Sequence, residues 1–202
     1  IVTFIHAWQD AKISMERIGE IHSSQDEEPA NEIKLHELAV NQVISVKNIS
    51  FRYPGAAKYV LNDVSFDIPT GKTTAIVGAS GSGKTTLMKI LLKFYNPDKG
   101  EIRVGNDFLA QISQKEWRTY CGAVMQEGFI FNDTIARNIS IGHDYPEPDK
   151  LNNAMNIAHI RQFVSELPLG YNTKIGNEGI GLSTGQKQRL LIARAVYKNP
   201  QF

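Results

Sequence analysis

One nine-residue stretch constrains the fold of this chain more than any other: GASGSGKTT, at residues 78–86. It holds three glycines; the outer two, Gly78 and Gly83, are separated by four residues, and Lys84 and Thr85 follow directly. The short apolar segment 73–77 precedes it, and a helical pattern follows. A glycine-rich loop between a strand and a helix is the P-loop arrangement, in which backbone N–H groups surround phosphate oxygens and the helix dipole attracts the anion.

The residue types in this loop predict a purine nucleoside triphosphate and Mg²⁺ as its ligands. In such loops the lysine reaches the β and γ phosphates and the first hydroxyl after it ligates Mg²⁺, so Thr85 is a predicted metal ligand. A plain surface turn is the alternative, but the flanking strand and helix patterns disfavour it. The predicted phosphate-binding residues are Gly78, Ser80, Gly81, Ser82, Gly83, Lys84, Thr85 and Thr86.

The composition is that of an ordinary globular protein. Hydrophobic residues make up 42% of the 202 residues, and 22 basic against 21 acidic residues give a net charge of +1. This balance predicts no nucleic-acid partner. The single cysteine, Cys121, excludes an internal disulfide, fits a reducing compartment and is predicted to be a buried small hydrophobe. The sequence contains neither an apolar run of about 18 residues nor a signal-peptide pattern.

The chain divides into three predicted segments. Residues 1–22 repeat apolar side chains at a 3.6-residue period, which predicts either a surface helix or the cytoplasmic end of a membrane helix. Residues 23–42 are acidic, polar and interrupted by proline, as in a linker. Residues 43–202 are predicted to form the folded domain. The chain opens on Ile1 instead of Met, as expected of a piece of a longer protein.

Strand and helix patterns alternate within the third segment. The predicted strands are residues 43–49, 64–68, 73–77, 101–104 and 123–125. Long helices are predicted from Gly83 or Lys84 to about residue 94 and from about 184 to 198, and the intervening region from 109 to 182 is mostly helical.

A second motif, Leu182-Ser183-Thr184-Gly185-Gln186, opens the last predicted helix, which is rich in Arg and Ala. Taken alone, it is a helix N-cap pattern. Together with the P-loop, it resembles the LSGGQ signature motif of ABC ATPases, with Thr184 where the family usually has Gly. A helix N-terminus with a hydroxyl and a glycine N–H is also an anion site. We therefore predict that Ser183, Gly185 and Gln186 contact nucleotide.

Three further positions resemble functional positions of the family. Tyr53 resembles the aromatic residue that stacks on adenine, although a core tyrosine is the alternative. Gln126, directly after the predicted strand 123–125, resembles the Q-loop glutamine that contacts Mg²⁺ or the attacking water, so it is the predicted catalytic and second metal-site residue. Asn177 stands where exporters of the family usually carry Glu, with Glu178 one residue late.

The resemblance covers residues 43–202 and implies an α/β fold: a P-loop NTPase of the ABC type. Such a domain has a RecA-like core, an antiparallel β subdomain and an α-helical subdomain. By family order, the strand ending in Asp-Glu (Walker B) and a switch histidine come after a segment like residues 198–202. None of the histidines follows the signature; they are His6, His22, His36, His143 and His159. We therefore expect an incomplete domain that binds ATP but hydrolyses it poorly, from a parent protein that is an ATPase.

The function implied by the resemblance is ATP-driven export. Two copies would meet head to tail as a homodimer, with each ATP between Lys84 of one copy and Ser183 and Gly185 of the other. A fused or associated membrane domain would place the domain at the cytoplasmic face of the cytoplasmic membrane. Segment 12–18 and the signature helix look most like peptide or bacteriocin exporters, and lipid or drug exporters remain open.

Two other functions remain possible at this point. One is a soluble ABC-type ATPase of DNA repair or chromosome maintenance, although such proteins separate the two motifs by coiled coils or zinc modules. The other is a non-catalytic module that only senses nucleotide.

Overall fold

The computed structural model describes residues 2–23, 28, 41–126, 128–143, 145–176 and 179–202, which form two compact units at residues 1–34 and 35–202. The first unit holds α1 (Val2–Ser23), as the periodicity predicted. Trp8 and Met15 are exposed on this helix. No helix in the described ranges is both long and apolar enough to cross a membrane. The predicted linker lies mostly outside these ranges, and the domain boundaries stay predictions.

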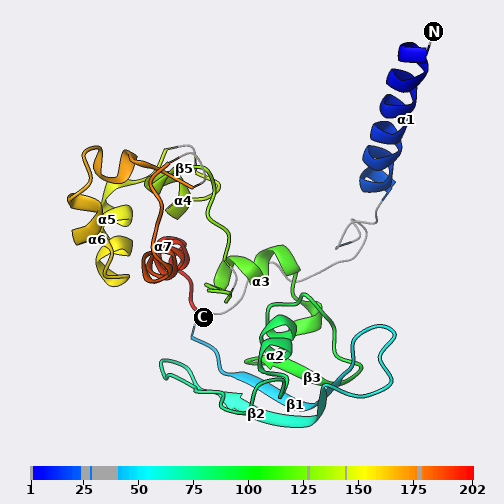
Figure 1. The fold of residues 1–202 in the computed structure, drawn as a ribbon. Helices are drawn as coiled ribbons and strands as arrows, with labels where there is room; N and C mark the ends of the chain where they lie inside the picture. The colour runs from blue at the N-terminus through cyan, green and yellow to red at the C-terminus, as the bar shows by residue number, and fades with distance from the viewer. Residues whose placement is uncertain (1, 24–27, 29–40, 127, 144, 177–178) are drawn as a thin grey trace. The chain divides into compact units, whose positions relative to one another are not determined.

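A four-stranded antiparallel sheet forms one lobe of the second unit (Figure 1). Its strands are β1 (Ile44–Phe51), β2 (Leu61–Ile68), β3 (Lys99–Val104) and β4 (Asp107–Phe108), in the order β2-β1-β3-β4. The central strand β1 sets the register, since Ile44 pairs with Ile68 on one side and Val104 on the other. The antiparallel β subdomain and three of the predicted strands are therefore confirmed.

Helices α2 (Lys84–Leu91) and α3 (Gln114–Tyr120) complete the core of this lobe, with the 3₁₀ helix η1 (Leu109–Gln111) between β4 and α3. One face of α2 buries Leu87 and Ile90 in the same core as the apolar residues of β1. Trp117 of α3 is 1% exposed and donates its indole N–H to the Leu91 carbonyl at 2.7 Å. This packing fixes α2, and with it the end of the P-loop, in the β lobe.

Short helices form the second lobe (Figure 1). They are α4 (Ile135–Ile139), α5 (Pro148–Ile157), α6 (Arg161–Ser165), η2 (Gly170–Asn172) and α7 (Thr184–Tyr197), with a two-stranded sheet of β5 (Asp133–Thr134) and β6 (Lys174–Ile175). Their core is separate from that of the β lobe and includes Ile135, Leu151 and Leu190. The α-helical subdomain is thus confirmed.

Two predicted strands are absent from the structure. Residues 73–77 and 123–125 have no regular secondary structure, and Val77 is 88% exposed. A strand depends on a ladder of hydrogen bonds to a neighbour, and no strand in the described part of the chain pairs with either segment. The apolar pattern indicated segments suited to a buried strand, but it contained no information on which strand each would pair with.

Directly before segment 123–125, residues 120–122 form two hydrogen bonds of the parallel-strand type with Phe202. The N–H of Phe202 donates to the Tyr120 carbonyl at 3.1 Å, and the N–H of Gly122 donates to the Phe202 carbonyl at 2.8 Å. This is the hydrogen-bond pattern of parallel strands, with Phe202 opposite Cys121. The ring of Phe202 lies 5.3 Å from that of Trp117, so residues after α7 return to the core of the β lobe.

Candidate nucleotide-binding site

The end of the P-loop has a backbone conformation that requires glycine. Gly83, the N-cap of α2, has φ of +91°, in the left-handed region. A Cβ at this position would lie 2.8 Å from a methyl carbon of Leu61 and 3.0 Å from the Val60 carbonyl oxygen. The first N–H groups of a helix lack partners within it, so the amides at the start of α2 suit a bound anion.

Lys84 lies within its own loop. Its ammonium donates to the carbonyl oxygens of Gly78 at 2.8 Å and Ala79 at 2.7 Å, and approaches the Ser82 hydroxyl at 3.4 Å. An ammonium group has three donors, and these three oxygens account for all of them. A triphosphate that binds Lys84 must therefore replace contacts inside the loop. Thr85, the predicted metal ligand, is exposed beside it.

Tyr53 is in direct contact with the P-loop. Its hydroxyl lies 3.0 Å from the Thr86 hydroxyl. The tyrosine ring is half-buried and meets the rings of Phe51 and Tyr95 edge to face, at centroid distances of 5.1 and 5.3 Å. The structure thus brings Tyr53 to the predicted site. The packing of its ring also fits the alternative, in which Tyr53 is a structural residue of the core.

The signature segment forms a capping box at the start of α7. The Ser183 hydroxyl accepts from the N–H of Gln186 at 3.3 Å, and the Gln186 side-chain oxygen accepts from the N–H of Ser183 at 2.8 Å. The segment is therefore a helix N-cap, as its pattern alone suggested. Ser183 and Thr184 are nevertheless exposed, and the Ser183 O–H still has its proton to donate. The segment can therefore cap its own helix and still donate a hydrogen bond to a ligand.

The P-loop and the signature belong to different lobes. The helix behind the P-loop, α2, packs in the core of the β lobe. The helix behind the signature, α7, packs in the core of the helical lobe through Leu190, Ala193 and Tyr197. Each predicted anion site is therefore positioned by its own hydrophobic core.

The other predicted positions are less informative. Gln126 is exposed at the end of the irregular segment 123–125. Asn177 and Glu178 lie outside the described residues. No group of three or more His, Cys, Asp or Glu suited to a metal occurs in the described ranges.

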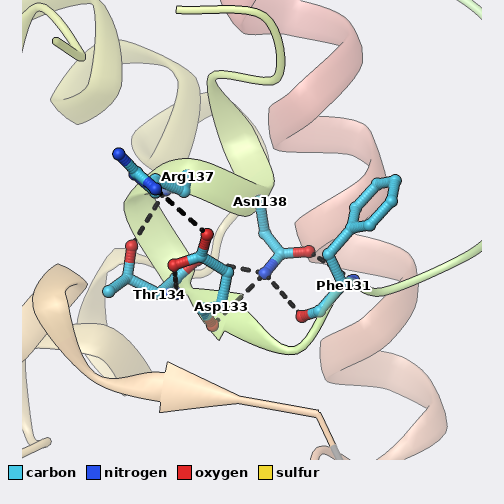
Figure 2. A network of polar contacts seen from close by, with 5 residues as sticks. All are labelled: Phe131, Asp133, Thr134, Arg137 and Asn138. Carbon is cyan, nitrogen blue, oxygen red and sulfur yellow. Dashed lines mark hydrogen bonds and ion pairs between the residues drawn. The ribbon is translucent and has the colours of Figure 1, made fainter. Parts of the chain in front are cut away.

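Sequence reasoning missed the role of Asn138 of α4. Its side chain is 0% exposed and closes the loop before the helix (Figure 2). The amide nitrogen donates to the carbonyls of Phe131 at 2.9 Å and Thr134 at 3.0 Å, and the amide oxygen accepts from the Phe131 N–H at 2.8 Å. Thr134 in turn caps α4 by accepting from the Arg137 N–H at 3.2 Å, and Arg137 pairs with Asp133 at 3.6 Å.

Arg194 connects this loop to α7. Its guanidinium donates to the carbonyls of Asn138 at 2.8 Å and Phe129 at 2.9 Å, and lies 5.7 Å from the centre of the Phe131 ring. Partial burial lowers the pKa of Arg194 from its ordinary value, although arginine stays charged at neutral pH. Through Arg194, the helix that carries the signature contacts the segment that follows Gln126.

Cys121 is buried as predicted, and burial raises the pKa of its thiol to about 12, against a smaller opposite effect of Lys198. The thiol is therefore protonated at neutral pH and unsuited to nucleophilic chemistry. Lys198 itself donates to the carbonyls of Arg118 and Cys121, which ties the end of α7 to the β lobe.

The fold and the two sequence motifs together point to one class: a P-loop nucleotide-binding domain with a separate signature-bearing helical lobe. Residues 61–202 match the family model described as ABC transporter. The chain therefore belongs to the ABC transporter family, the class of the ABC-type ATPases, as the two motifs predicted.

The similar proteins refine this class. The chain is 36% identical over 204 residues to the leukotoxin export ATP-binding protein LtxB of Aggregatibacter actinomycetemcomitans, and 37% identical to the toxin RTX-I translocation ATP-binding protein of Actinobacillus pleuropneumoniae. Both alignments cover the whole chain but only 29% of the relative. A solved bacterial Atm1-family ABC exporter with ATP bound is similar at a TM-score of 0.80 and 34% identity, over 95% of this chain and 34% of that one. The domain is thus an ATP-binding domain of the exporter type.

Proposed function

We propose that this chain is the ATP-binding region of an exporter that couples ATP binding and hydrolysis to movement of a polypeptide across the cytoplasmic membrane. The observation that carries the proposal is the pair of exposed helix N-termini suited to an anion, one on each lobe. The names of the relatives, which refer to toxin export and translocation, support a polypeptide substrate over a lipid or drug. Peptides and bacteriocins are the smaller members of that substrate class.

The P-loop residues fit a triphosphate. Gly83 lets the backbone pass into α2, and the unpaired amides of the first turn would hold phosphate oxygens. Lys84 would leave the loop carbonyls for the β and γ phosphates, and Thr85 with Gln126 would supply oxygens to Mg²⁺. Tyr53, next to Thr86, would stack on adenine. These residues would bind and orient ATP.

The signature would act on the nucleotide of a second copy. Ser183 and Gly185 lie at an exposed helix N-terminus whose dipole favours a phosphate. Because α2 and α7 belong to different cores, a head-to-tail homodimer would bring one P-loop against the other signature and enclose two nucleotides. Binding would close this dimer and hydrolysis would release it.

The segment after Gln126 would carry this motion to the membrane domain. Phe129 and Phe131 are exposed, with ring centroids 5.0 Å apart. Arg194 and Asn138 attach this segment to the signature helix. Closure at the signature would therefore move the exposed aromatic pair, at the cytoplasmic face of the membrane, together with α7.

The proposal is tested on the full-length protein reconstituted in liposomes. ATP-dependent uptake of a labelled polypeptide, abolished by Lys84→Ala, is the expected result. ATP turnover stimulated by DNA and independent of lipid would instead indicate a soluble ATPase of DNA maintenance. Tight ATP binding without phosphate release would indicate a nucleotide sensor, and either outcome would refute export.

A further inference from the structure

We infer that the hydroxyl of Tyr53 positions the Thr86 side chain, so that the adenine-contacting residue also acts on the phosphate cradle. The inference rests on the proposed ATP site and deepens it, because stacking on adenine needs only the ring of Tyr53. Its basis is the 3.0 Å contact between the Tyr53 and Thr86 hydroxyls, which are 33 residues apart in sequence.

Packing fixes both partners of this contact. Tyr53 follows β1 by two residues, and its ring meets those of Phe51 and Tyr95 edge to face. Thr86 is the third residue of α2 and is only 6% exposed. Its backbone N–H belongs to the first turn, where helix amides have no acceptor within the helix. The contact therefore joins the end of the central strand to the helix N-terminus that would face phosphate.

Either hydroxyl can be the donor in this contact, and the proton count shows what remains for a ligand. Each hydroxyl has one proton and two acceptor lone pairs, and no other hydrogen bond joins either group in the described part of the chain. The mutual hydrogen bond thus uses one of the two hydroxyl protons, and the other proton is left for a second hydrogen bond. When Tyr53 donates to Thr86, the Thr86 O–H is left to donate to an anion at the first turn of α2. Such chains of hydrogen bonds strengthen one another.

The inference predicts that a change at the adenine-contacting residue will weaken binding of a ligand that has no adenine. Tyr53→Phe keeps the ring and removes the hydroxyl. In the full-length protein, we expect it to weaken binding of both Mg-ATP and Mg-tripolyphosphate by the same factor, about 2- to 10-fold, the loss of one hydrogen bond. Thr86→Val should weaken both ligands by a similar factor, and Thr86→Ser should restore binding because it keeps the hydroxyl.

A double-mutant cycle separates positioning from independent effects. The variant with both Tyr53→Phe and Thr86→Val should bind no more weakly than Thr86→Val alone, because both changes remove one shared interaction. Tyr95→Phe is the matched control: it removes a hydroxyl from the same aromatic cluster without touching the P-loop. It should leave both affinities unchanged.

Two results would overturn the inference: an unchanged tripolyphosphate affinity in Tyr53→Phe, or losses that multiply in the double variant. If thermal unfolding shows that Thr86→Val does not fold, the tripolyphosphate measurement on Tyr53→Phe decides alone. A wild-type protein that binds no ATP would instead refute the proposed function, which keeps the two failures distinguishable.

Discussion

The two predicted anion sites of this domain are built in opposite ways. At the P-loop, Gly83 takes a left-handed conformation and the ammonium of Lys84 donates to oxygens of its own loop. At the signature, Ser183 and Gln186 satisfy each other in a capping box that needs no ligand. The first site must exchange internal contacts when a phosphate binds, whereas the second keeps its cap and only adds a contact.

This difference suggests a division of labour. A site that rearranges around its ligand suits primary binding, because the interactions formed with phosphate replace those lost inside the loop. A helix end that is already satisfied remains ordered whether or not a nucleotide is near, so it suits recognition of a nucleotide that another subunit presents. The comparison thus predicts strong effects on binding at the P-loop and effects on assembly at the signature.

The largest expected effect follows loss of the P-loop cation. Lys84→Ala removes the charge that would contact the β and γ phosphates, and should lower ATP turnover of the full-length protein about 100-fold or more. Phosphate release measures this effect. Lys89→Ala, in the last turn of the same helix, is the matched control and should leave turnover nearly unchanged. Equal effects of the two changes would contradict a special role for Lys84.

A charged, bulky residue at the signature should separate assembly from binding. Ser183→Arg fills the exposed helix end and loses the cap, so ATP-dependent association of two copies should disappear while binding at the P-loop persists. Light scattering and equilibrium nucleotide binding measure the two properties on the same sample. If ATP-dependent association persists in this variant, the model of a head-to-tail dimer that shares its nucleotides is wrong.

The glycine requirement of the P-loop predicts a loss of stability. Gly83→Ala places a Cβ at φ +91° against Leu61 and the Val60 carbonyl, and should cost about 2 kcal/mol or more of unfolding free energy. Gly55→Ala is the control. Its φ is +80°, but nothing lies within 4 Å of the added Cβ, so it should cost only about 1 kcal/mol. Thermal unfolding of the full-length protein compares them, and equal losses would show that crowding at Gly83 is unimportant.

The smallest expected effect concerns the cap. Ser183→Ala should destabilise α7 by about 1 kcal/mol, and Thr134→Ala should do the same for α4 because it removes a similar cap. Hydrogen exchange at the first turn of each helix measures the change. Only Ser183→Ala should also weaken ATP-dependent association. If Thr134→Ala weakens it equally, the signature hydroxyl has no role beyond capping.

The sequence predicted those parts of the structure that depend on local order. The glycines before Lys84 and the spacing of Ser183 and Gln186 each specify a local backbone arrangement, and both arrangements are present. The prediction of a strand at residues 73–77 was wrong, because a strand needs a hydrogen-bonded partner and periodicity does not reveal one.

Contacts distant in sequence were also hidden. In the sequence, Arg194 is one of several basic residues of an Arg- and Ala-rich helix, and Asn138 is one polar residue of a short helical segment. Only the packing of α4 against α7 shows that they bond to each other and to the segment after Gln126. The same holds for the Tyr53 and Thr86 hydroxyls, since each motif was recognised without any sign of the other.

The position of Lys84 bears on how quickly the site can fill. An ammonium in bulk water must shed its hydration shell to meet an anion, but this one already lies among carbonyl dipoles. An arriving phosphate exchanges these dipoles for full negative charges, one donor at a time. We therefore expect the slow step of nucleotide capture to be release of the Lys84 ammonium from the Gly78 and Ala79 carbonyls, with its dehydration contributing little.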